Sequence, residues 1–120
     1  MIRLVDLEVY KISMEIGENI WNIVDRWNTY QKDTLGKQLT RAADSIALNI
    51  SEGYGRFHYK DNKNFCYYSR GSAFETQSAL TKAKQRNLMT KDEFELLKSK
   101  LDLYFKMINS YIKSIGQKSQ

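Results

Sequence analysis

The sequence contains no proline, one cysteine and one histidine among its 120 residues. Proline costs about 3 kcal/mol inside a helix, so its absence permits long uninterrupted helices. Cys66 has no second cysteine with which to form a disulfide, which favours a reducing compartment, and we expect a cytoplasmic protein. With His58 as the only histidine, one chain cannot assemble a zinc site of the usual four-ligand type. We therefore expect no metal site and no cofactor.

Long apolar runs and catalytic motifs are missing as well. No apolar stretch approaches the roughly 20 residues that a membrane-spanning helix requires. The first residues include acidic side chains, where a signal peptide would need a basic start and an uninterrupted apolar stretch. The Glu-x-x-His motif of di-iron bundles and the nucleophile-elbow motif of hydrolases are both absent. We expect neither export nor a membrane span, and no enzymatic activity.

What the chain does contain is a helical pattern of apolar residues. Its length suits one domain, residues 1–120, and 42% hydrophobic with 28% charged residues is typical of a globular protein. Apolar residues recur at steps of three and four, which predicts helices over about 4–27, 34–53, 61–86 and 90–115. Short polar turns join them, so consecutive helices must run in opposite directions. The fold class predicted is all-α, an antiparallel up-and-down four-helix bundle.

The helix ends carry recognisable signals. Thr90 with Glu93 three residues later predicts a capping box at the start of the last helix. For the second helix, Asp33 or Thr34 is the expected N-cap, and for the third, Asp61 or Asn62. Gly53 is expected to end the second helix, because glycine readily adopts the positive φ of a helix C-terminus.

The second predicted helix also carries a sequence motif. The run from Leu39 to Gly53 reads LTRAADSIALNISEG, and Gly71-Ser72 is followed by Glu75 and Leu80. This pattern resembles a bacterial four-helix-bundle family first noticed as open reading frames in intervening sequences of 23S ribosomal RNA genes. The matching positions are Arg41, Ala42, Ser45, Ile46, Asn49, Glu52, Gly53, Ser72 and Glu75. The resemblance extends over essentially the whole chain. The family often has one proline in the first interhelical turn and another near the end of this helix motif, and this chain has neither.

This resemblance implies a four-helix bundle that assembles as a homopentameric ring with a central channel. One branch of the family consists of accessory proteins of diversity-generating retroelements, which bind nucleic acid and a reverse transcriptase. A homo-oligomer, RNA or DNA, and a reverse transcriptase or other protein are therefore the expected partners.

The polar motif residues have several interpretations. A bundle core tolerates buried polar side chains only when they are hydrogen-bonded or paired. Arg41, Asn49, Glu52 and Glu75 are therefore expected to form a polar network, together with the small residues Gly53 and Ser72, inside one subunit or between subunits. Contact with a ligand and simple exposure to solvent are the alternatives.

Charge is distributed unevenly along the chain. Residues 54–86 hold seven basic and two acidic side chains, whereas residues 1–53 hold six basic and eight acidic ones. The basic residues are Arg56, Lys60, Lys63, Arg70, Lys82, Lys84 and Arg86. Aromatic residues are interleaved with them near the start of the segment: Tyr54, Phe57, Tyr59, Tyr67 and Tyr68. Because cations attract phosphates and aromatic rings stack on unpaired bases, this segment predicts binding of RNA or DNA. Alternatively, the cations form a solvated face and the aromatic side chains contact another subunit or a protein partner.

Overall fold

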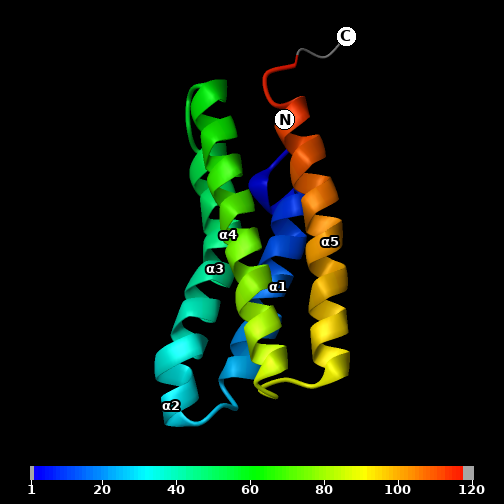
Figure 1. Ribbon diagram of the computed structural model, residues 1–120. Coiled ribbons are helices and arrows are strands. Elements are labelled where there is room, and N and C mark those ends of the chain that lie inside the picture. The colour runs from blue at the N-terminus through cyan, green and yellow to red at the C-terminus, as the bar shows by residue number, and fades with distance from the viewer. Residues whose placement is uncertain (1, 118–120) are drawn as a thin grey trace.

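The computed structural model describes residues 2–117, which form an antiparallel four-helix bundle without strands over that range (Figure 1). The elements are a 3-10 turn η1 (Leu4–Asp6), α1 (Glu8–Val24), α2 (Thr29–Gln31), a π-helical segment η2 (Lys32–Gly36), α3 (Lys37–Tyr54), α4 (Tyr59–Gln85) and α5 (Lys91–Ser114). Each long helix packs against two neighbours, α1 and α4 both lying against α3 and α5. The predicted all-α up-and-down bundle is confirmed.

The molecule is elongated, with extents of 51 × 23 × 20 Å. The turn between α3 and α4 lies at one end of the bundle, at the top of the view, and we name it the upper end (Figure 1). The short helix α2 and the turn between α4 and α5 lie at the opposite end, which we name the lower end. Residues at opposite ends of α4 are therefore separated by most of the length of the molecule.

The first two helices differ from the predicted bounds. The predicted helix over 4–27 is divided, because Leu7 is extended between η1 and α1, and α1 ends at Val24. The second helix begins earlier than predicted, since Asn28 forms a capping box with Gln31. The prediction that Asp33 or Thr34 caps this helix was wrong, because both residues lie inside the π-helical segment.

Gly53 does not act as a helix terminator. The helix continues to Tyr54, and Gly55 follows with a right-handed φ of −78°. A Cβ on Gly53 would lie 2.7 Å from Asn62 Oδ1 and 2.9 Å from Phe65 Cβ. This glycine is therefore required by the close approach of α3 and α4, and the predicted positive φ was wrong.

The other predicted caps had different outcomes. His58 occupies the N-cap position of α4 without a side-chain hydrogen bond, so the prediction of Asp61 or Asn62 was wrong. Thr90 and Glu93 form the predicted capping box, in which each side chain accepts from the backbone N–H of the other residue. The predicted box is confirmed.

The core runs along the full length of the bundle. Its largest fully buried apolar side chains come from all four helices: Ile16, Ile20, Leu39, Ile46, Ile50, Leu80, Leu97, Leu101 and Ile108. The helices α3 and α4 bury several small residues, including Ala43, Ala73 and Ala83, and they are in extensive contact with each other. Among the helices described for residues 2–117, none combines the length and the apolar character needed to cross a bilayer.

Candidate nucleic-acid interface

The basic side chains of residues 54–86 do not form one patch. Arg56, Lys60 and Lys63 lie near the upper end of the bundle, whereas Lys82 and Arg86 lie at or just beyond the lower end of α4. At a rise of about 1.5 Å per helical residue, Lys60 and Arg86 are roughly 40 Å apart. The predicted interface therefore divides into two groups of cations.

Two of the predicted cations already have partners within the chain. Arg56 Nη2 lies 3.2 Å from Glu52 Oε2, and its guanidinium stands over the Phe65 ring at 4.8 Å. Arg70 Nη1 donates to Asn109 Oδ1 at 2.7 Å. The guanidinium of Arg70 also stands 5.0 Å from the centroid of Tyr67. Lys60 and Lys63, near the upper end, make neither an ion pair nor a cation–π contact within residues 2–117.

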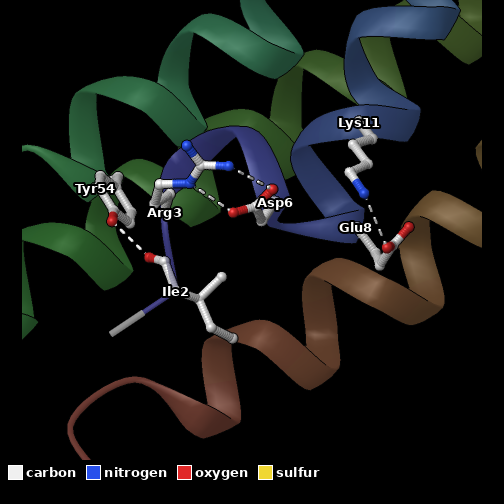
Figure 2. Close-up of polar contacts among 6 residues, drawn as sticks. All are labelled: Ile2, Arg3, Asp6, Glu8, Lys11 and Tyr54. Carbon is white, nitrogen blue, oxygen red and sulfur yellow. Dashed lines mark hydrogen bonds and ion pairs between the residues drawn. The ribbon is translucent and has the colours of Figure 1, made fainter.

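Aromatic residues at the upper end also have structural contacts. Tyr54 Oη donates to the carbonyl oxygen of Ile2 at 2.6 Å, which holds the start of the chain against α3 (Figure 2). Tyr59 packs against Gly116, where a Cβ would lie 3.1 Å from Tyr59 Cδ2. Phe57, by contrast, is 91% exposed in the turn. Of these three predicted aromatics, Phe57 is the most exposed, and Tyr59 is still 66% exposed although it touches Gly116.

Figure 2 also shows how the start of the chain is ordered locally. Arg3 Nε donates to Asp6 Oδ2 at 2.8 Å, and Lys11 Nζ lies 3.3 Å from Glu8 Oε1. Both pairs are exposed and three residues apart, so each contributes little to stability. These cations are engaged with neighbouring carboxylates and add no free positive charge to the upper end.

At the lower end, α4 meets the beginning of α3 around a surface hollow of about 480 Å³. We name it the basic hollow, because its lining contains four cations and one carboxylate. The lining residues are Asp33, Thr34, Leu35, Lys37, Gln38, Arg41, Lys82 and Arg86. None of the four cations forms an ion pair within residues 2–117. Lys84 points elsewhere, with its Nζ 5.1 Å from the centroid of Phe94.

A second hollow, of about 430 Å³, adjoins the first between α1 and α3. We name it the tryptophan hollow, and it is lined by Trp21, Val24, Asp25, Lys32, Gly36, Lys37, Thr40 and Arg41. Lys37 and Arg41 belong to both hollows and form the ridge between them. Trp21 is 55% exposed. The lower end thus combines an exposed indole with a group of cations.

The π-helical segment helps to shape the tryptophan hollow. Such segments are rare and occur frequently at functional sites. Gly36 ends this segment and is buried against α1, where a Cβ would lie 2.9 Å from Val24 Cγ1 and 3.0 Å from the carbonyl oxygen of Gln31. Because no side chain projects from this position, α3 begins close to α1 and no side chain of residue 36 occupies the hollow.

Trp21 and Lys37 are members of the candidate site that sequence reasoning did not identify. Trp21 lies off the apolar stripe of its helix, and this displacement was the available sign that its ring is exposed. Lys37 precedes Arg41 by one helical turn, which places both on one face of α3. Their proximity to Lys82 and Arg86 depends on the packing of α3 against α4.

The polar motif residues are not joined to one another within the described chain. Arg41 and Glu75 are exposed, Glu52 pairs with Arg56, and Asn49 Nδ2 donates to the carbonyl oxygen of Ser45 at 2.9 Å. Ser72 is half-buried and Gly53 is buried in the contact with α4. These side chains bind their own helix or face solvent, so a network between subunits stays a prediction.

Among residues 2–117, the groups whose pKa is shifted by their surroundings do not line either hollow. Burial raises the pKa of the Cys66 thiol to about 11 and also raises that of Tyr104. The capping hydrogen bond from Thr90 lowers the pKa of Glu93, to which Arg26 also contributes. Within residues 2–117, no three His, Cys, Asp or Glu side chains are grouped so that they could hold a metal ion. The arrangement around the hollows suits binding of an anion.

Comparisons with known proteins agree with this fold. The model of the 23S rRNA-intervening sequence protein family matches residues 5–110. A crystal structure of a protein with unknown function from the S23 ribosomal protein family of Bacteroides thetaiotaomicron VPI-5482 superposes with a TM-score of 0.78. It is 22% identical in sequence, and the match covers 88% of this chain and 99% of that one. At this identity the likeness shows the fold alone. No curated protein matches the chain.

Proposed function

The chain belongs to the 23S rRNA-intervening sequence protein family, and from this premise and the charge of its lower end we propose that it binds RNA or DNA as a non-enzymatic accessory protein. The observation that carries the proposal is the basic hollow. Its four cations come from two helices and lie around one concave surface without ion-pair partners in the described chain. Cations left unpaired in this way are available to phosphate groups.

The energetic basis of such binding is counterion release. Each Lys or Arg that neutralises a phosphate displaces condensed counterions, so affinity falls steeply as salt concentration rises. The formal charge of +5 for the whole chain favours association with any polyanion. The basic hollow adds a defined place where several phosphates can be neutralised together.

We also propose that the protein is a homo-oligomer and, following the family resemblance, a homopentameric ring in the cytoplasm. Repeating the basic hollow around a ring would sum five modest fields into one that a monomer cannot generate. Following the same resemblance, a reverse transcriptase or another protein is the proposed protein partner.

The direct test is a titration of labelled single-stranded and duplex RNA and DNA at two salt concentrations, with the mass in solution measured in parallel. We expect salt-sensitive binding by a particle of about five times 14.1 kDa. The double variant Lys82→Glu with Arg86→Glu should abolish most of the binding. Its matched control is Lys106→Glu with Lys113→Glu, which changes the net charge equally on α5. Equal losses in both variants, or binding insensitive to salt, would contradict the proposed interface.

A protein-interaction scaffold is the second candidate, and the exposure of Phe57 favours it. Its ring is 91% exposed in the turn between α3 and α4, and aromatic side chains, Phe included, are enriched at protein interfaces. If this function holds, Phe57→Ala weakens binding of the protein partner, and the salt concentration has little effect on that binding. This alternative involves no nucleic-acid binding, so failure of every RNA and DNA strand to bind in the titration would favour it.

A further inference from the structure

We propose that the tryptophan hollow receives one unpaired base of a nucleic-acid strand, stacked on the indole of Trp21, while the basic hollow binds the adjoining phosphates. This inference rests on the proposed function, because it requires that the strand is bound at the lower end. It goes further by specifying that the preferred ligand is single-stranded and by assigning separate roles to the two hollows.

The first argument comes from the contrast between the two tryptophans. Trp27 is 8% exposed, and its Nε1 donates to the carbonyl oxygen of Leu88 at 2.8 Å, so it is part of the core. Trp21 is 55% exposed and lines a hollow instead. Leaving an indole in water forgoes the burial of one of the largest apolar side chains. Its position gives a flat aromatic surface on which a base can stack.

The second argument is the size and lining of the hollow. Its volume of about 430 Å³ lies within the range of roughly 300–1,000 Å³ usual for small-molecule sites. Val24 and Gly36 provide apolar or featureless surface beside the indole, and Thr40 provides a hydroxyl. A planar ring with polar edges matches such a lining.

The third argument is charge complementarity. The two hollows together carry five cations and two carboxylates. One carboxylate, Asp25, already lies 3.9 Å from Lys32 Nζ. Lys37 and Arg41 form the ridge between the hollows, so a strand whose base stacks on Trp21 passes its backbone over these two cations toward Lys82 and Arg86. A negatively charged ligand with aromatic units fits this arrangement better than an apolar helix of another protein.

Stacking of this kind requires a base that is not already stacked in a duplex. Single-strand binding proteins combine a positively charged groove with aromatic side chains, and each such ring accepts any base. The hollow therefore discriminates between unpaired and paired strands rather than between sequences. RNA and DNA strands both offer bases that can stack and phosphates that can bind cations. Comparing the affinities of the two identifies which one is the preferred ligand.

The test uses fluorescence of the full-length protein titrated with a 12-nucleotide single strand, as RNA and as DNA, and with the same strand in a duplex. Single strands should quench the emission of the wild type, and Trp21→Phe should remove the quenching because Trp27 is buried. Trp21→Ala should weaken binding of the single strand by roughly 5- to 150-fold and leave duplex binding within about 2-fold. Phe74→Ala is the matched control, since Phe74 is 54% exposed but lies on α4 outside both hollows.

The outcomes separate this inference from the proposed function. Salt-sensitive binding of single strands that is indifferent to Trp21→Ala would overturn the stacking site and leave the proposed function standing. Absence of any nucleic-acid binding would overturn both. If Trp21→Ala instead lowers the mass in solution without changing strand binding, the hollow is occupied by a second copy of the chain and the inference is wrong. Thermal unfolding checks that each variant is folded, and because Trp21 is 55% exposed, Trp21→Ala should change the free energy of unfolding by only about 0.5 kcal/mol.

Discussion

The side-chain oxygens of Ser69 and Tyr104 lie 2.6 Å apart in the fully buried core, where α4 faces α5. Ser69 Oγ also lies 2.7 Å from the carbonyl oxygen of Ile46 on α3, to which it donates. Since a serine hydroxyl has one proton, Tyr104 Oη must be the donor to Ser69. This chain of two hydrogen bonds joins three helices at one level of the bundle and satisfies every buried polar atom involved.

Ser69→Ala should therefore destabilise the protein more than Tyr104→Phe. The serine variant leaves the buried tyrosine hydroxyl without a partner, which costs about 1–3 kcal/mol. The tyrosine variant removes a hydroxyl while Ser69 keeps its bond to Ile46, and a loss of about 0.5–1.5 kcal/mol is expected. Urea unfolding of both variants measures the difference. Equal losses would show that the hydroxyl of Tyr104 finds another partner.

Two glycines on neighbouring helices should respond in opposite directions to alanine. Gly53→Ala places a Cβ 3.0 Å from the backbone oxygen of Asn62, which cannot move away without separating α3 from α4. We expect a loss of about 1–3 kcal/mol in the free energy of unfolding. Gly71 lies mid-helix with no atom within 4 Å of such a Cβ, so Gly71→Ala should stabilise by about 0.5–1 kcal/mol. Thermal unfolding distinguishes the two.

Stability should decline in alkaline solution through Cys66. Burial raises the pKa of this thiol to about 11, so the unfolded chain loses its proton at lower pH than the folded chain does. The stabilisation that the buried, protonated thiol adds to the free energy of unfolding is fully present below the unfolded pKa of about 8.5. It is lost as the pH rises toward 11, at up to about 1.4 kcal/mol per pH unit. Tyr104 and Tyr111, whose pKa values burial also raises, act in the same direction. Urea midpoints between pH 8 and 10 should fall less steeply for Cys66→Ala, and identical slopes would contradict the assignment.

The salt dependence of nucleic-acid binding should distinguish the two ends of the bundle. Replacing a cation that contacts phosphate lowers the slope of log affinity against log salt concentration by about 1. We expect this change for Lys82→Ala and for Lys37→Ala at the basic hollow. Lys60→Ala removes the same charge near the upper end and should leave the slope nearly unchanged. A larger effect at Lys60 would place the interface at the other end.

The sequence alone was sufficient for the fold and for the last helix boundary. Apolar steps of three and four report directly on which helical face is buried, so four helices could be predicted before any packing was known. The Thr90 and Glu93 capping box is confirmed because both partners lie within one turn of the chain. Gly53 was misinterpreted, since its role is a contact with α4 rather than a backbone angle of its own.

The basic residues show the limit of the same reasoning. Residues 54–86 look like one positive segment, but most of them lie along a single helix that separates Lys60 from Arg86 by most of the molecule's length. Lys37 and Arg41 are more than 40 positions from Lys82 and Arg86, and only antiparallel packing of α3 against α4 places them around one hollow. Local periodicity determines helices because the interactions involved span a few residues. The candidate interface was decided by tertiary structure, because the phosphate of a ligand interacts with whatever charges are close in space, whatever their order in the chain.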